Sequence, residues 1–230
     1  MHKKETKIIS VGGSIIIPKT GFDIKFLKKF RSLILKHVKQ GQKFVLVIGG
    51  GGTCRQYQNA AKSVVKLSKD DLDWIGINTT VYNAKFVQML FKDYAYKEVI
   101  TDPRKQIKTN KSIIIAAGWK PGCSTDKGAV MLAKAYKAKE VINLSNIDFV
   151  YDKDPSKFKN AKKIKEINWK DFRKNIVGYK WVPGANAPFD PIASGQAEKM
   201  KLKVSILNGN ELSEVDKVLN NKNFRGTVIS

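Results

Sequence analysis

The sequence has few cysteines and no long apolar run. Its two cysteines, Cys54 and Cys123, are too few for a disulfide framework or a zinc site, so a reducing cytoplasm is the expected location. No apolar run approaches the roughly 20 residues that a membrane helix needs. Charged residues dominate positions 1–7 and lead directly into a predicted strand, so no signal peptide is expected.

Acidic residues are also scarce, which leaves a strongly basic chain. The 230 residues include 43 Lys and Arg against 20 Asp and Glu, for a net charge of +23. Such a charge would suit a nucleic-acid-binding module, which would bind in a salt-sensitive way and compete with nucleotides. However, the lysines are scattered through every predicted element, and no basic stripe alternates with aromatic residues. We therefore expect a surface that attracts nucleotides, without nucleic acid as a partner.

Short apolar runs alternate with helical patterns along the chain. The predicted strands are 8–11, 44–48, 99–101, 112–117, 140–143, 203–207 and 226–229. The predicted helices are 22–39, 53–67, 71–92, 128–137, 168–175 and 212–219, with one more opening at Asp190 and Pro191. Strands that alternate with helices predict an α/β fold with a parallel sheet.

The most informative stretch is 43–55, where four glycines follow an unbroken apolar strand. Gly49–Gly52 would let the backbone approach a ligand closely, and the next helix offers free N–H groups and the positive end of its dipole to a phosphate. Arg55 would add a charge-assisted contact. A turn that is glycine-rich only for packing is the alternative. The spacing excludes both a P-loop and a Gly-x-Gly-x-x-Gly loop.

Glycine-rich or polar motifs occur at four more positions that a sheet edge could bring together. They are 11–14, the loop ending at 124–126, the polar segment 144–155 and the proline-containing segment 182–193. Ligands of α/β sheets bind at the carboxyl ends of the strands. Two of these motifs also have a local explanation, which is a helix-start residue for Asp126 and an Asn/Asp-rich turn for 144–155.

In this order the motifs resemble the amino acid kinase family and, within it, the archaeal-type UMP kinases. The Asp-x-Val-Tyr-x-x-Asp-Pro spacing within 148–155 is the most specific, and the resemblance covers essentially the whole chain. It implies a three-layer α/β/α sandwich with a mainly parallel central sheet, in a single domain over 1–230. About 1–140 would bind the acceptor and about 141–230 would bind ATP. The implied reaction, in pyrimidine biosynthesis, is transfer of the γ-phosphoryl group of MgATP to UMP by a cytoplasmic homo-hexamer.

The resemblance also implies a role for each matching position. The catalytic positions are Gly13, Ser14, Asp126 and Asp190. The UMP-binding positions are Gly50, Arg55, Asp73, Trp119, Lys120, Pro121, Gly122, Cys123, Ser124 and Thr125, with Asp73 on the ribose. The ATP-binding positions are Gly13, Ser14, Gly51, Arg55, Ser145, Asn146, Tyr151 and Asp154. Mg²⁺ is expected with ATP, and no side chain is assigned as a metal ligand.

The chain departs from the family pattern where many relatives have a lysine. Ser10 and Ala187 stand at two such positions, which leaves open which cation steadies the γ-phosphate. The candidates are Lys19, Lys120 and Lys127.

Phe149 is a further departure, because the family turn has glycine there. It would cost about 1 kcal/mol if its φ were positive. These departures motivate one alternative, a catalytically weakened nucleotide-binding regulatory protein. The other is a sibling kinase of another small phosphate, such as isopentenyl phosphate. Such kinases typically have a histidine in or beside the glycine loops, whereas His2 and His37 lie elsewhere.

Overall fold

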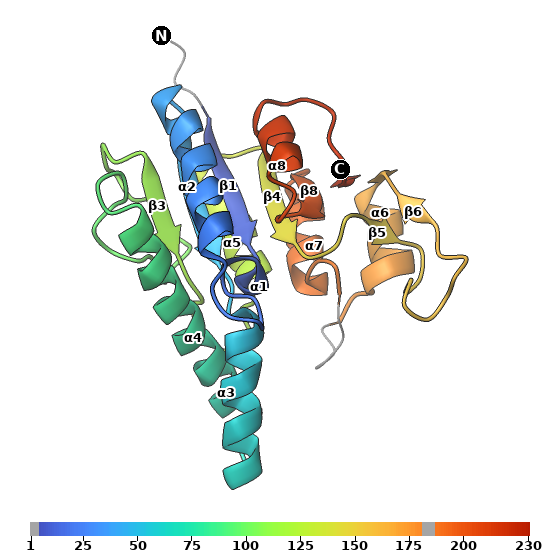
Figure 1. Ribbon diagram of the computed structural model, residues 1–230. Helices are drawn as coiled ribbons and strands as arrows, with labels where there is room; N and C mark the ends of the chain where they lie inside the picture. Colours follow the sequence, from blue (N-terminus) through green and yellow to red (C-terminus); the bar gives the residue numbers. More distant parts are fainter. Residues whose placement is uncertain (1–4, 181–186) are drawn as a thin grey trace.

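The computed structural model describes residues 5–180 and 187–230, and its centre is a seven-stranded sheet (Figure 1). The strand order is β3-β2-β1-β4-β8-β9-β7, and every neighbouring pair is parallel except β8 with β9. The strands are β1 (Thr6–Val11), β2 (Lys43–Ile48), β3 (Ile113–Ala116), β4 (Glu140–Ser145), β7 (Glu166–Ile167), β8 (Lys203–Asn208) and β9 (Thr227–Ile229). A separate antiparallel pair joins β5 (Val150–Tyr151) to β6 (Lys163–Ile164).

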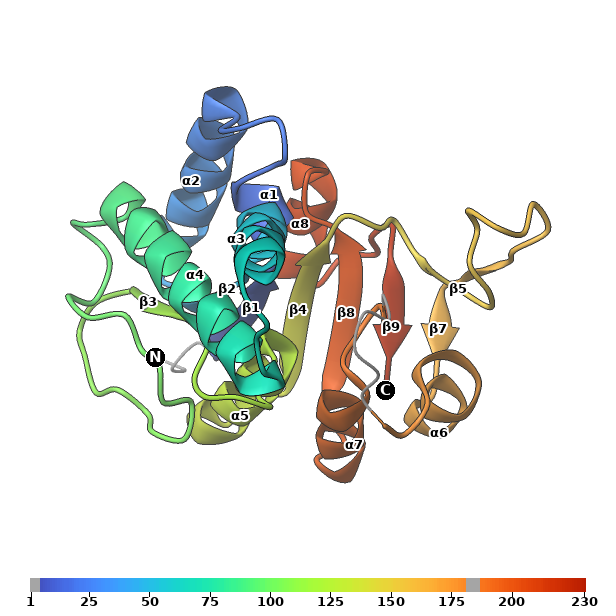
Figure 2. The same ribbon diagram turned by 90° about the horizontal axis from the view of Figure 1, so that it is seen from below.

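Helices cover both faces of this sheet (Figure 2). One face packs against α1 (Gly13–Ile16), α2 (Ile24–Lys39), α4 (Lys69–Leu90) and α8 (Leu212–Leu219). The other packs against α5 (Thr125–Tyr136), α6 (Trp169–Phe172) and α7 (Pro191–Lys199). The long pair α3 (Gly51–Val64) and α4 extends beyond the sheet (Figure 1). None of the described helices combines the length and the apolar character needed to cross a membrane.

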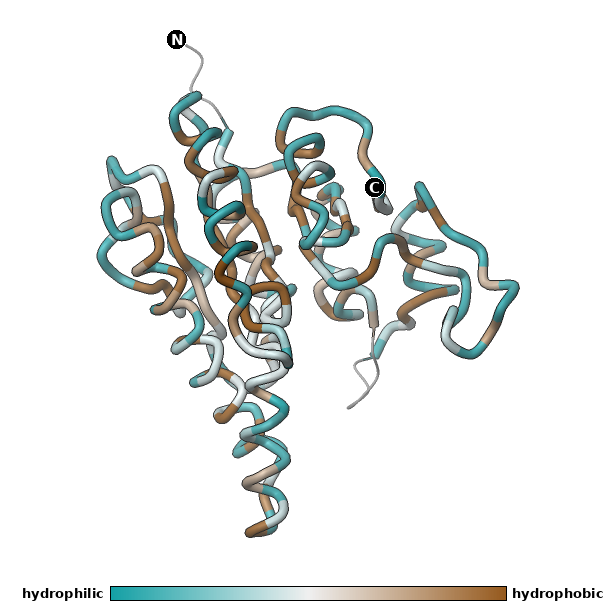
Figure 3. Tube along the Cα trace, viewed as in Figure 1, coloured by the Kyte–Doolittle hydropathy of each residue, from teal (hydrophilic) through white to brown (hydrophobic). Residues whose placement is uncertain are grey.

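The sheet separates two apolar clusters because successive strand residues point to opposite faces. In β2, Leu46 and Ile48 face the cluster beneath α2 and α4, whereas Val45 and Val47 face the cluster beneath α5 and α7. All four are fully buried, and the apolar residues concentrate along the strands and the inner sides of the helices (Figure 3). The predicted three-layer α/β/α sandwich with a mainly parallel sheet is therefore confirmed.

Several local predictions were wrong, and the short strands β5, β6 and β7 were not predicted. The segment 99–101 is not a strand: Ile100 alone bridges to Ala116, and the chain then turns away towards Pro103, which has no N–H to donate. The chain after β1 forms the short helix α1, which was not predicted. The predicted helix 168–175 is only one α-turn, and a π-helix over Arg173–Val177 continues it to Gly178 at φ +74°.

Candidate functional site

Two glycine loops at the ends of β1 and β2 are in direct backbone contact. A Cβ atom on Gly13 would lie 2.3 Å from the nitrogen of Gly51 and 2.5 Å from the oxygen of Gly49. A Cβ on Gly51, where φ is +63°, would lie 2.5 Å from the nitrogen of Ser14. Cβ atoms essentially never approach other atoms within 3.0 Å, so these positions accept only glycine without a shift of the backbone.

The second loop presents backbone donors. Across residues 5–180 and 187–230, no protein oxygen accepts a hydrogen bond from the N–H of Gly50 or Gly51. These groups precede or begin the 14-residue helix α3, whose first N–H groups lack intrahelical partners. Unpaired N–H groups beside a helix N-terminus attract an anion such as a phosphate.

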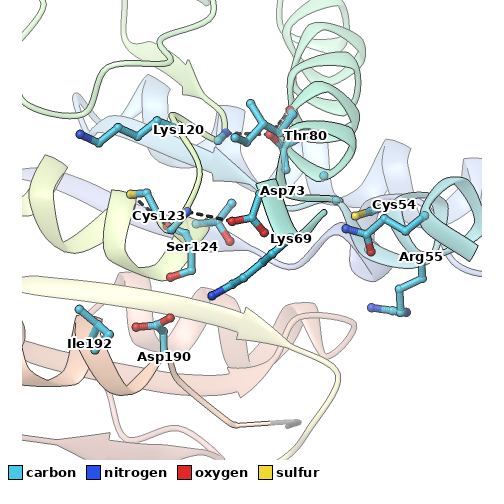
Figure 4. Close-up of a pocket in the computed structure, with 18 residues that line it drawn as sticks. Cys54, Arg55, Lys69, Asp73, Thr80, Lys120, Cys123, Ser124, Asp190 and Ile192 are labelled. Atoms are coloured by element: carbon cyan, nitrogen blue, oxygen red, sulfur yellow. Dashed lines mark hydrogen bonds between the residues drawn. The ribbon is translucent and has the colours of Figure 1, made fainter. Parts of the chain in front are cut away.

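A cavity of about 590 Å³ opens beside this loop (Figure 4). Among the residues predicted to bind or transfer phosphate, its wall contains Gly50, Gly51, Arg55, Asp73, Lys120, Gly122, Cys123, Ser124, Thr125 and Asp190. Trp119 and Pro121 were also predicted but do not belong to this wall. The Trp119 ring instead contacts two cations, with the guanidinium carbon of Arg104 4.7 Å and the Lys120 ammonium 4.3 Å from its centroid.

Helix α4 positions both loops that border the cavity. The Asp73 carboxylate accepts a hydrogen bond from the Gly122 N–H at 2.9 Å, and the Thr80 hydroxyl accepts one from the Gly118 N–H at 2.7 Å. The Asn83 amide donates to the backbone oxygens of Gly49 and Gly50 (3.0 and 3.2 Å). Spacings of seven and three residues place these side chains on one helix face.

Thr80 and Asn83 were not among the predicted site residues. The signal that could have found them is their place in α4: both are polar, yet they occupy the helix face that turns towards the sheet and is buried. The helix itself begins earlier than the predicted 71–92, because Ser68 and Asp71 form a reciprocal capping box.

Three basic side chains line the cavity. Arg55 comes from α3, Lys120 from the loop after β3, and Lys69 from the first turn of α4. Lys69 extends into the cavity between Asp73 and Asp190 (Figure 4). Lys69 was not among the predicted site residues, although it lies four residues before Asp73 and therefore on the same helix face.

The other two candidate lysines do not line the cavity. Lys19 lies next to the second loop, with its Cγ 3.3 Å from the position a Cβ on Gly52 would take. Lys127 follows Asp126 in the first turn of α5, and its charge opposes the rise in pKa that burial causes at the Cys123 thiol. Ala187 is exposed at the start of the second described range. Residues 182–186 of the proline-containing motif lie outside the described part of the chain.

Three segments converge on the Asp126 carboxylate. One oxygen accepts hydrogen bonds from the Ser10 hydroxyl (3.4 Å) and the Asn143 amide (3.2 Å), and the other accepts one from the Asp190 N–H (3.1 Å). The residue keeps partial exposure, but its carboxylate is enclosed by protein. Burial, followed by repulsion from Asp190, raises the Asp126 pKa to about 7, although the three hydrogen bonds oppose the rise.

Asp190 also has a structural role as predicted. Its side chain accepts a hydrogen bond from the Ala193 N–H at 2.7 Å and caps α7, and Pro191 occupies the first helical position. The cap brings the start of α7 to Asp126, so Asp126 and Asp190, which were predicted from distant motifs, lie together.

The predicted ATP-binding positions fall in two places. Gly13, Ser14, Gly51 and Arg55 lie in α1 and α3. Ser145, Asn146, Tyr151 and Asp154 lie along the chain that leaves β4. Gly12 packs against this strand end, since a Cβ there would lie 2.9 Å from the Leu144 oxygen. Ser145 ends β4 and contacts Asn146, Tyr151 belongs to β5, and Asp154 follows in a turn.

The same segment contains Asp154 and Phe149. The Asp154 carboxylate accepts hydrogen bonds from the Ser156 hydroxyl (2.7 Å) and N–H (2.9 Å), which lower its pKa. Phe149 has no positive φ, because the described non-glycine residues with positive φ are Lys137, Lys201 and Asn221. The strain considered for Phe149 therefore does not arise.

Comparisons with known proteins agree with this geometry. The model of the amino acid kinase family matches residues 5–208. A uridylate kinase from Methanococcus aeolicus is 32% identical over 97% of this chain and 98% of its own, and one from Methanocaldococcus jannaschii is 30% identical over 96% and 98%. The crystal structure of the uridylate kinase from Archaeoglobus fulgidus superposes with a TM-score of 0.80 at 27% identity, covering 99% of this chain and 100% of that one.

Proposed function

Because this chain belongs to the amino acid kinase family, we propose that it transfers the γ-phosphoryl group of MgATP to UMP, giving UDP and ADP. The observation that supports this most directly is the contact between the loops after β1 and β2, which leaves no room for a Cβ at Gly13 or Gly51. Gly50 and Gly51, whose N–H groups have no acceptor in the described protein, line a cavity large enough for a nucleotide. Two phosphates held by adjacent backbone loops can react in line.

The acceptor would occupy the 590 Å³ cavity. Its phosphate would bind the Gly50 and Gly51 N–H groups and Arg55, its ribose would bind Asp73, and its base would lie against the loop after β3. The donor would bind along the end of β4, with its terminal phosphate at Gly13 and Ser14. In this arrangement about 1–140 binds the acceptor and about 141–230 binds ATP.

The residues present suit phosphoryl transfer, which needs positioning and charge neutralisation more than a covalent intermediate. Ser10 donates a hydrogen bond to Asp126 and therefore organises the centre at a position where many relatives have a lysine. Lys69 and Lys120, which line the cavity, supply positive charge beside the reacting phosphates. Mg²⁺ would enter as part of the donor, bound mainly by phosphate oxygens and water.

A coupled assay of ADP release with UMP, CMP, AMP and isopentenyl phosphate tests the proposal. We expect turnover with UMP and much slower turnover with AMP and isopentenyl phosphate. Absence of turnover with UMP at millimolar concentration in the presence of Mg²⁺ and ATP would refute it. The sibling-kinase and regulatory-protein alternatives are not favoured, since the relatives and the structural neighbour are named uridylate kinases.

The remaining parts of the proposal concern the setting of the enzyme. We place it in the cytoplasm, in pyrimidine biosynthesis, as a hexamer. Light scattering coupled to size-exclusion chromatography would measure the mass in solution against the 25.8 kDa of one chain.

A further inference from the structure

Asn83 is a buried polar residue of α4 whose side chain holds the glycine loop after β2. It has no solvent exposure, and its amide nitrogen donates to the backbone oxygens of both Gly49 (3.0 Å) and Gly50 (3.2 Å). Its amide oxygen is buried and has no hydrogen-bond partner within the described residues. The reverse orientation of the amide would place that oxygen against two carbonyl oxygens, so the two donors must face the loop.

An unpaired buried acceptor is destabilising, so an apolar residue would serve packing alone better than Asn83 does. The function of the amide must therefore come from its two donors. Glycine has the widest backbone freedom, and consecutive glycines at 49 and 50 have little preference for one orientation of their peptide groups. The Gly50 oxygen also accepts a hydrogen bond from the Cys54 N–H at 3.3 Å. Within the described residues, the Gly49 oxygen accepts its hydrogen bond from Asn83.

The orientation of these carbonyl groups determines where the N–H groups point. The described peptide bonds are all trans, and in a trans peptide the C=O and the N–H point in opposite directions. Directing the oxygens of Gly49 and Gly50 towards Asn83 turns the N–H groups of Gly50 and Gly51 away from it. Both glycines line the cavity there, and neither N–H has an acceptor in the described protein.

We propose that Asn83 is a positioning residue that orients the Gly50 and Gly51 N–H groups towards the phosphate of the acceptor nucleotide. It does not touch the nucleotide itself. Preoriented donors need no rearrangement when the anion binds, and this lowers the cost of binding and of the reaction. The inference rests on the proposed function and deepens it.

The test compares UMP with uridine, which has the same base and ribose but no phosphate. Asn83→Asp keeps the size of the side chain and replaces both donors with an oxygen that repels the two carbonyl groups. We expect calorimetry to show UMP affinity reduced about 10- to 100-fold, corresponding to one or two lost charge-assisted hydrogen bonds. Uridine affinity and the KM for ATP should stay unchanged.

Asn78→Asp is the matched control, because Asn78 is an exposed residue of the same helix. It makes the same chemical change and should leave both affinities unchanged. Equal losses of UMP and uridine affinity in Asn83→Asp would indicate a purely structural role and overturn the inference. Unchanged UMP affinity in a folded Asn83→Asp would overturn it as well.

If Asn83→Asp does not fold, a measurement on the wild-type protein tests the inference. With ¹⁵N-labelled glycine, the amide signals of Gly50 and Gly51 should move strongly downfield with UMP and little with uridine. Equal responses to the two ligands would overturn the inference. If the wild-type protein neither turns UMP over nor binds it more tightly than uridine, the proposed function itself is refuted. If the wild-type protein is active but the Gly50 and Gly51 signals do not respond to UMP, only this inference is overturned.

Discussion

Replacing Gly13 with alanine should disturb the contact between the two glycine loops. The new Cβ would lie 2.3 Å from the Gly51 nitrogen and 2.5 Å from both the Gly49 oxygen and the Gly50 carbonyl carbon. All three atoms belong to the backbone, so no side-chain rotation can relieve the contacts. The Gly51 nitrogen would have to retreat by about 0.7 Å to reach the closest distance that Cβ atoms tolerate.

Overpacking of this kind costs about 1–3 kcal/mol, and three simultaneous backbone contacts place Gly13→Ala near the upper end. The unfolding free energy, measured by urea denaturation, should therefore fall by about 3 kcal/mol. Because the displaced N–H of Gly51 is one of the proposed phosphate donors, kcat/KM should fall on the order of 100-fold. The coupled ADP assay measures this directly.

Gly128→Ala provides the matched control. Gly128 lies in α5, and a Cβ there would meet no atom within 4 Å. Alanine should stabilise this helix by up to about 1 kcal/mol. A Gly13→Ala variant that unfolds within about 0.5 kcal/mol of the wild type and keeps full activity would refute the reasoning from loop contact.

Three further predictions concern other parts of the site. Without nucleotide, the protonated Asp126 stabilises the fold fully below its ordinary pKa of 3.8, and this contribution is lost as the pH rises through about 7. The Asp126→Asn variant should lack this decline, which amounts to about 2 kcal/mol after allowance for partial exposure and is measurable by urea denaturation at pH 4 and pH 8. Asp73→Ala removes the acceptor of the Gly122 N–H and the proposed ribose contact. The KM for UMP should therefore rise about tenfold, with little change in the KM for ATP. Equal rises in the two KM values would contradict the assignment of Asp73 to the UMP ribose. Thr227→Val leaves the buried Val150 N–H without its hydrogen-bond acceptor, which lies at 2.8 Å. The variant should lower the unfolding free energy by about 1–3 kcal/mol and raise the KM for ATP. An unchanged KM for ATP would show that β9 does not support the ATP-binding segment.

The motifs near the strand ends could be predicted from the sequence because they depend on local chemistry. Four glycines after an apolar strand predict a backbone that must approach another group, whatever that group is. Asp190 followed by Pro191 predicts a helix start, and the structure confirms it. Alternating apolar runs and helical patterns were sufficient for the parallel sheet and its two covered faces, because burial on both faces requires apolar residues at every strand position.

Side-chain partners were less predictable. Ser10 appeared only as a missing lysine, yet its hydroxyl contacts Asp126, which lies 116 residues later in the sequence. In the sequence Asn83 is only one polar residue of a predicted helix, and its hydrogen bond to the Gly49 oxygen spans 34 residues. Trp119 belongs to the predicted UMP loop, but its ring packs against Arg104 and Lys120 and does not line the cavity.

By itself, the sequence determined most of the strands and helices, the family resemblance and the glycine positions, since each depends on a short run of residues and its periodicity. Only the tertiary structure decided that the loops after β1 and β2 touch, that α4 holds two loops at once, and that Asp126 lies among groups from three segments. The reason is physical: a hydrogen bond or a close backbone contact depends on distances to within a few tenths of an ångström, and those distances arise only when the sheet and both helical layers pack together.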